Sequence, residues 1–150
     1  MEALTLIGIS FVGTVLWVVS PEVASALYPT KYGWHPVAVG LTCAVGQVAA
    51  HWLLYVGGDR LIGRWGWLRR KTEAIHTRFG PKTESRYLGL TGVAMVFGMP
   101  PAVAMTAMAS GFGVRPAHAM AVALVGRFTR FTILAIWGTA ILAWWGTTFP

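Results

Sequence analysis

Two arginines in the last third of the chain are the residues best placed to do chemistry. Arg127 and Arg130 interrupt a long apolar stretch, residues 117–149, and their spacing of three places both on one face of a helix. An arginine at membrane depth costs about 2.5–3.5 kcal/mol on insertion scales, so it is expected to face a cavity or a partner. Guanidinium groups bind phosphate through two parallel hydrogen bonds. The pair therefore predicts an anion site, with snorkelling from a tilted helix as the structural alternative.

Glu22 is the acidic candidate for the same site. It follows Ser20 and Pro21, which predict the start of a helix directly after the uncharged residues 3–19. Beside such a break, its carboxylate could pair with one of the two arginines or take up and release a proton. The structural alternative is an ordinary acid that stabilises a helix N-terminus.

Two histidines, His51 and His118, lie in apolar segments and could in principle ligate a haem or a chlorin. Neither has a second ligand at a fixed spacing, so packing or hydrogen bonding is the expected role. The sequence contains no phosphate-binding glycine loop, no cluster of metal ligands and no pairing of nucleophile and base. We therefore expect no metal, no cofactor and no enzymatic activity. The single cysteine, Cys43, allows no disulfide within the chain.

The composition places these residues in an integral membrane protein of one domain. Of the 150 residues, 55% are hydrophobic and 11% are charged, whereas soluble domains have about 25% charged residues. Residues 60–86 contain eight basic and two acidic side chains, which is +6 of the net charge of +7. This concentration of charge predicts a cytosolic loop rather than a nucleic-acid-binding face. Residues 60–79 resemble an interfacial helix on an anionic cytoplasmic leaflet, with a stop-transfer linker as the alternative.

Proline and glycine breaks recur at a spacing of 80 residues. The matching pairs are Pro21 and Pro101, Gly33 and Gly113, Pro36 and Pro116, Gly46 and Gly126, and Gly58 and Gly138. Opposite Arg127 and Arg130 the first half has Gln47 and Ala50, and opposite Glu22 the second half has Ala102. Paired breaks at membrane depth are the best sequence indication of a transporter site, because lipid cannot satisfy the backbone groups that they free.

The breaks predict an all-α membrane fold made of two inverted repeats. Residues 36–58 are uncharged and long enough to span, whereas Pro100 and Pro101 divide residues 87–114 into two pieces that are too short. We predict re-entrant helical hairpins at about 3–29 and 87–112, each followed by a spanning helix. The alternative is a pair of spans with proline kinks.

Residues 1–150 are predicted to form one membrane domain. Repeat one is 3–58, the basic linker is 59–86 and repeat two is 87–149. The candidate transport and substrate-binding residues are Glu22, Arg127, Arg130, Pro21, Pro100, Pro101 and Gln47.

The order of these motifs resembles the DedA / SNARE-associated Golgi protein superfamily (the VTT domain), and its small, single-domain bacterial branch in particular. The resemblance rests on Pro21-Glu22, Gly46 with Tyr55-x-x-Gly58-x-Arg60, Arg78-Phe79-Gly80, Pro100-Pro101, Ser110-Gly111-Phe112 and the run Gly126-Arg127-Phe128-Thr129-Arg130-Phe131. Many members have arginines on both sides of the proline at the second break, and residues 95–99 here have none.

The resemblance implies a transporter that moves a lipid or a lipid phosphate, such as a polyprenyl phosphate, across the bacterial inner membrane with proton or ion coupling. It matches Glu22 to the acidic position at the first break, and Arg127 and Arg130 to basic positions in the last helix. Membrane lipids are the expected partners, and a homodimer or a larger membrane complex is possible. The alternative functions are a non-catalytic structural subunit of a membrane complex and a pigment- or haem-associated protein.

Overall fold

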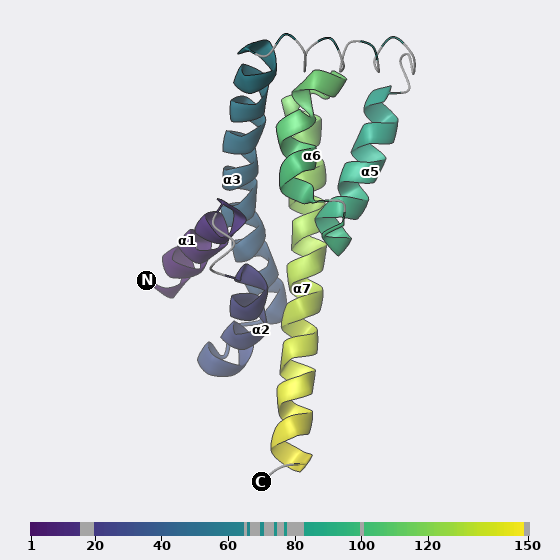
Figure 1. Cartoon of the computed structure of the whole chain (residues 1–150). Coiled ribbons are helices and arrows are strands. Elements are labelled where there is room, and N and C mark those ends of the chain that lie inside the picture. The colour runs from purple at the N-terminus through teal and green to yellow at the C-terminus, as the bar shows by residue number, and fades with distance from the viewer. Residues whose placement is uncertain are drawn as a thin grey trace. The chain divides into compact units, whose positions relative to one another are not determined.

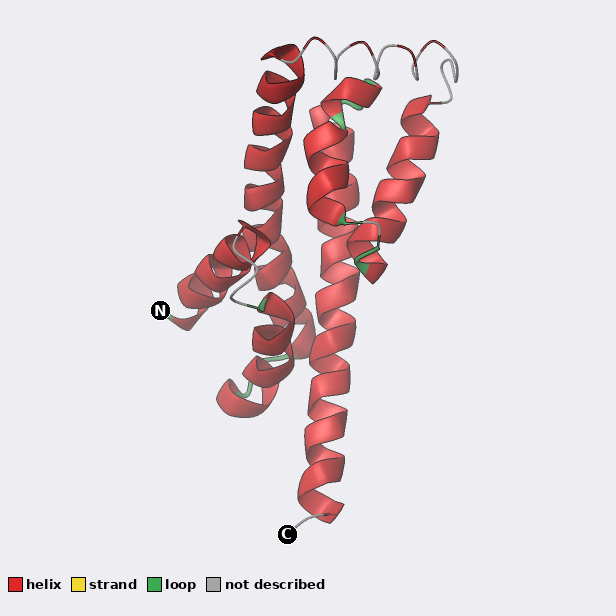
Figure 2. Cartoon of the chain, viewed as in Figure 1, coloured by secondary structure: helices red, strands yellow, loops and turns green. Residues whose placement is uncertain are grey.

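The computed structural model describes residues 1–15, 20–64, 83–99 and 101–148, with four single residues of the linker at 66, 70, 74 and 77. Every regular element among these residues is helical (Figure 1, Figure 2), which confirms the all-α class. The elements in chain order are α1 (Glu2–Val15), α2 (Pro21–Tyr32), α3 (Pro36–Arg64), α5 (Thr83–Phe97), α6 (Ala102–Met108), the 3-10 helix η2 (Ser110–Phe112) and α7 (Pro116–Thr148). Pro100 and most of the predicted interfacial helix lie outside the described residues.

Two of the helices are long and apolar enough to cross a membrane. The qualifying stretches are Pro36–Gly58 in α3, with 23 residues, and Pro116–Ile141 in α7, with 26 residues. A helix needs about 20 apolar residues to cross the hydrocarbon core. Both stretches therefore meet the requirement of the predicted membrane class.

Helix α3 continues further than the sequence indicated. Repeat one is predicted to end at residue 58, where the charged linker begins, yet α3 runs on to Arg64. Charge ends an apolar stretch but does not break a helix, and no proline follows Gly58 in α3 to remove a backbone hydrogen bond. Similarly, α5 begins at Thr83, four residues before the predicted start of the second repeat.

The local breaks at the 80-residue spacing have matching conformations. Gly33 follows α2 with φ 70° and ψ 18°, and Gly113 follows η2 with φ 70° and ψ 17°. Glycine adopts this left-handed conformation without the steric cost that a Cβ brings. Proline opens the next helix in both cases, at Pro36 in α3 and at Pro116 in α7.

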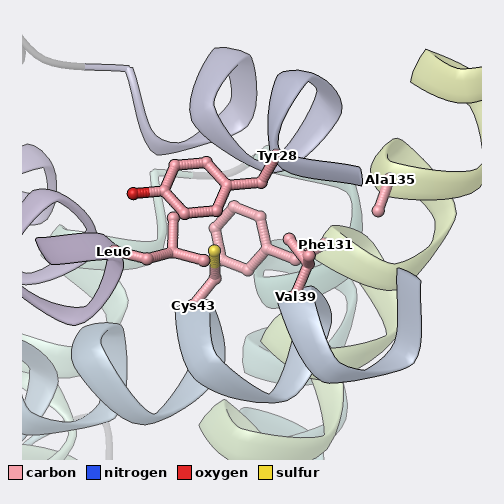
Figure 3. Packing of buried hydrophobic residues seen from close by; sticks show 6 residues of the cluster. All are labelled: Leu6, Tyr28, Val39, Cys43, Phe131 and Ala135. Atoms are coloured by element: carbon pink, nitrogen blue, oxygen red, sulfur yellow. The ribbon is translucent and has the colours of Figure 1, made fainter. Parts of the chain in front are cut away.

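The chain forms two compact units. Unit 1 consists of residues 1–50 and 127–150, and unit 2 consists of residues 51–126. The core of unit 1 draws on α1, α2, α3 and α7, whose side chains converge in Figure 3. Its members are Leu6, Tyr28, Val39, Cys43, Phe131 and Ala135. The core of unit 2 is formed by Tyr87, Ala109, Val114 and Ala119.

Glycines allow close helix contacts inside each unit. In unit 1, a Cβ on Gly138 of α7 would lie 2.6 Å from the carbonyl oxygen of Ala26 in α2. In unit 2, a Cβ on Gly58 of α3 would overlap the carbonyl oxygen of Ala107 in α6. The two glycines are 80 residues apart, and each brings a long helix against the backbone of a short one. A larger side chain at either position would have to push the two helices apart.

In each unit, a carboxylate connects the start of one helix to the segment before a long helix. In unit 1, Trp34 Nε1 donates a hydrogen bond to Glu2 Oε2 at 3.1 Å. In unit 2, the backbone N–H of Arg115 donates to Glu84 Oε1 at 3.3 Å. Thus α1 begins beside the loop that follows α2, and α5 begins beside the loop that follows η2. The chain between these contacts folds back on itself in both units.

Candidate functional site

The acid and one of the arginines of the candidate site are in direct contact. Arg130 Nη2 donates a hydrogen bond to Glu22 Oε1 at 3.2 Å, with the two side chains 23% and 34% exposed. The residues are 108 positions apart in the sequence and both belong to unit 1. The predicted pairing of Glu22 with one of the two arginines is therefore confirmed, and the partner is Arg130.

The beginning of α2 holds the carboxylate in place. Ser20 is the N-cap residue, and its hydroxyl accepts a hydrogen bond from the backbone N–H of Val23. The same hydroxyl donates to Glu22 Oε2 at 3.2 Å. Pro21 occupies the first helical position, where its missing N–H costs no hydrogen bond. The cap and the proline together orient Glu22, so the local sequence positions one half of the ion pair.

Arg127 is the more deeply buried of the two arginines. It is 7% exposed and lies on the same face of α7 as the core residues Phe131 and Ala135. Arg130 and Glu22 are both within electrostatic range of its guanidinium. Its Nε has no hydrogen-bond partner among the described residues. A desolvated guanidinium of this kind is costly unless a partner neutralises it.

Gln47 also lies in unit 1, on α3. It is 3% exposed, and its Oε1 atom accepts no hydrogen bond from the residues that the structure describes. Pro21 is buried in the same unit, whereas Pro101 is exposed in unit 2. The predicted site residues of unit 1 are therefore Glu22, Arg127, Arg130, Pro21 and Gln47.

Ser10 is a candidate that the sequence analysis missed. It is fully buried on α1, and its Oγ has no hydrogen-bond partner within the described ranges. Leu6, Ser10 and Thr14 are spaced by four residues and all three are buried. This spacing marks one face of a helix and could have identified α1 as a contributor of hydroxyl groups.

The two histidines have hydrogen-bonded environments in unit 2. His51 is buried, with Nδ1 3.0 Å from Thr106 Oγ1, and the same hydroxyl donates to the carbonyl of Ala102. His118 Nδ1 lies 2.9 Å from Glu84 Oε1. No group of three side chains that could hold a metal ion occurs among the described residues. Both histidines therefore lie within hydrogen-bond distance of a neighbouring side chain, which agrees with the expected role in packing or hydrogen bonding.

The pKa of the Glu84 carboxyl group is lowered by its surroundings. The hydrogen bond with His118 lowers its pKa below the ordinary glutamate value, and the hydrogen bond from the backbone of Arg115 adds to the effect. Both interactions favour the charged carboxylate. The group therefore links α5 to the start of α7 most strongly when it is ionised.

Comparison with known proteins gives no independent assignment. No family model, no curated protein and no solved structure matches this chain. A function is therefore inferred from the contacts of the buried and charged side chains in unit 1.

Proposed function

We propose that this chain is a small membrane transporter of the DedA type that moves a lipid phosphate or a similar anionic amphiphile across the bacterial inner membrane. The observation that carries the proposal is the contact of Glu22 with Arg130 beside the buried Arg127. Two guanidinium groups on one helix face can bind a phosphate headgroup. A carboxylate in contact with one of them can compete with the phosphate and so release it.

The repeat supports a functional role for this pair. The positions equivalent to Glu22 and Arg130 in the other repeat are Ala102 and Ala50. Both alanines lie in regular helix, in α6 and α3, so that helix forms at these positions without either charge. A pair that the architecture does not require in one half is better explained by ligand binding than by folding.

We also infer that the two fold-back segments are re-entrant hairpins in inverted repeats. The contacts Glu2–Trp34 and Glu84–Arg115 bring the ends of each segment together, as a hairpin that enters and leaves on one side requires. Breaks in a helix are tolerated at membrane depth where they are buried in protein or line a wet cavity. The break at Pro21 leads directly to the carboxylate of the candidate site.

A simple exchange of partners at Arg130 would couple binding of the phosphate to movement of Glu22. A phosphate that binds Arg130 competes with Glu22 for the same guanidinium, so its binding breaks the contact between Arg130 and Glu22. Return of the carboxylate to Arg130 would then release the phosphate on the other face of the membrane.

Flux of a fluorescent polyprenyl phosphate in proteoliposomes tests the proposal. We expect Arg130→Ala to lower flux at least tenfold, because the headgroup loses a charged hydrogen-bond donor. The double substitution Glu22→Ala and Arg130→Ala should remain inactive while folding like the wild type, because it places the residues of the other repeat at both positions. Arg86→Ala is the matched control, since Arg86 is exposed on α5. Equal flux through the double variant and the wild type would refute the carrier.

A further inference from the structure

In the part of unit 1 that the structure describes, three buried polar side chains have atoms without a hydrogen-bond partner. Ser10 is 0% exposed, Gln47 is 3% exposed and Arg127 is 7% exposed. Among the described residues, nothing hydrogen-bonds Ser10 Oγ, Gln47 Oε1 or Arg127 Nε. Buried polar atoms in native proteins are nearly always paired, with protein, water or a ligand. A polar species that is not part of the protein is therefore expected to complete this region.

Ser10 and Gln47 lie at the contact between α1 and α3. Gly46, which precedes Gln47, is so close to α1 that a Cβ on it would lie 3.0 Å from Ser10 Cβ. Cys43, one helical turn before Gln47, has Ser10 beside its thiol, although the two do not reach hydrogen-bond geometry. Ser10 therefore lies beside Cys43, which is one helical turn from Gln47 on the same face of α3.

The same region of unit 1 extends to the charged residues. Cys43 is within electrostatic range of Glu22, and Glu22 is within range of Arg127 as well as in contact with Arg130. Cys43, which has Ser10 beside it, is thus within electrostatic range of the carboxylate that contacts Arg130. All of these residues belong to unit 1.

Glu22, Arg127 and Arg130 form a charged cluster in unit 1, and among these three described residues the charges do not balance. Arg127 and Arg130 carry one positive charge each, and Glu22 supplies one negative charge, so the cluster has one positive charge in excess. Removing an uncompensated charge from water is unfavourable unless a counter-ion accompanies it. The cluster is therefore complementary to a ligand of charge −1.

The hydrogen-bonding capacities specify the ligand further. A guanidinium group only donates hydrogen bonds, the Oε1 atom of Gln47 only accepts them, and the hydroxyl of Ser10 does both. A fully ionised phosphate has no hydrogen to donate and cannot satisfy Gln47 Oε1. A phosphate monoester that keeps one proton has charge −1 and one P–OH donor, so it fits the arginines and the glutamine at once.

We propose that Ser10 and Gln47 form a neutral subsite that binds the P–OH group of a singly charged phosphate monoester, while Arg127 and Arg130 bind its ionised oxygens. This assignment rests on the proposed lipid-phosphate transport and adds the two residues that select the headgroup. The subsite distinguishes ligands of equal charge by whether they carry a hydroxyl donor. Such discrimination arises because a ligand without the donor leaves a buried acceptor unpaired.

Flux of two lipids with identical chains, a phosphate monoester and its methyl phosphodiester, tests the subsite. At pH 5 both headgroups carry close to one negative charge, and only the monoester has a P–OH group, since its second pKa is about 6. We expect wild-type proteoliposomes to move the monoester at least about tenfold faster than the diester. Raising the pH to 8 should lower the ratio of monoester flux to diester flux, because the monoester then loses its P–OH proton. Gln47→Met should remove the preference for the monoester over the diester, whatever its effect on the absolute flux of either lipid.

Ser10→Ala is the second variant, because it removes a single oxygen and is less able to disturb packing than a change at Gln47. It should also lower the monoester preference. Size-exclusion profiles and unfolding temperatures establish that both variants are folded. A wild type that moves both lipids at equal rates, or a preference that survives both substitutions, would overturn the subsite while the carrier function stands. A wild type that moves neither lipid would overturn the transport proposal itself.

Discussion

At the scale of single residues, the charged groups of the two units have different surroundings. Glu22 and Arg130 are partly buried and lie beside a further cation, Arg127, whose Nε has no partner among the described residues. Glu84 is a carboxylate with two hydrogen-bond donors, from His118 and from the backbone of Arg115. The first arrangement has an excess of charge that a ligand can neutralise. The second is satisfied within the protein and is better suited to holding helices together.

The lowered pKa of Glu84 predicts that the stability of the fold depends on pH. Its pKa in the folded protein is below the ordinary value of about 4.3. Its interactions therefore stabilise the fold fully above about pH 4.3, and this contribution is lost as the pH falls through the lower folded-state pKa. We expect Glu84→Gln to be less stable than the wild type at pH 6 and to approach it at acid pH. Thermal unfolding in detergent micelles from pH 3 to pH 7 measures the difference, and a gap that stays constant with pH would contradict the assignment.

At the scale of elements, small residues decide how closely the helices approach. Gly58 lies against the Ala107 carbonyl in unit 2, and Gly138 lies against the Ala26 carbonyl in unit 1. Apolar side chains gain little by leaving lipid, so packing in a membrane depends on close backbone contact. The glycines at these two positions are therefore expected to contribute to stability through the space that they leave.

Gly58 and its neighbour Gly57 provide a matched test of helix packing. A Cβ at Gly58 would overlap the Ala107 backbone, whereas a Cβ at Gly57 would meet nothing within 4 Å. We expect Gly58→Ala to destabilise the protein by about 1–3 kcal/mol. Gly57→Ala should be neutral or stabilising by up to about 1 kcal/mol, because alanine is the better helix former. Unfolding in detergent measures both, and equal effects of the two substitutions would show that the contact with α6 does not limit packing.

At the scale of the whole molecule, the proposed inverted repeats determine which loops face the cytosol. The basic linker, residues 60–86, is expected in the cytosol by the positive-inside rule. If α3 crosses the membrane, His35 lies outside. If residues 87–112 form a hairpin, the chain returns to the cytosol at Arg115, and α7 then places Thr148 outside.

Single cysteines at positions 35, 115 and 148, in a Cys43→Ala background, test this topology. A membrane-impermeant thiol reagent added to intact spheroplasts should label His35→Cys and Thr148→Cys, and should label Arg115→Cys only after the membrane is permeabilised. His35 and Arg115 are exposed, so their labelling reports the side of the membrane rather than burial. A kinked span at residues 87–114 would exchange the results at 115 and 148.

The amino-acid sequence alone predicts the helical class, the two apolar stretches and the breaks at Pro21, Gly33, Pro36, Gly113 and Pro116. These features follow from local chemistry, because proline lacks an N–H and glycine tolerates positive φ whatever the rest of the chain does. The end of α3 lies six residues beyond the predicted end of repeat one at residue 58, because the charges that begin the linker do not interrupt backbone hydrogen bonding.

Which side chains meet depends on the packing of the helices and could not be predicted from the sequence. In the structure, Glu22 contacts Arg130 rather than Arg127. Ser10 of α1 lies beside Cys43 of α3, and His118 contacts Glu84. The residues of the first contact are 108 positions apart, so their meeting depends on how α2 packs against α7 and not on the preference of either segment. Local sequence supplies the groups and their helix faces, and the packing of those faces decides which groups become neighbours.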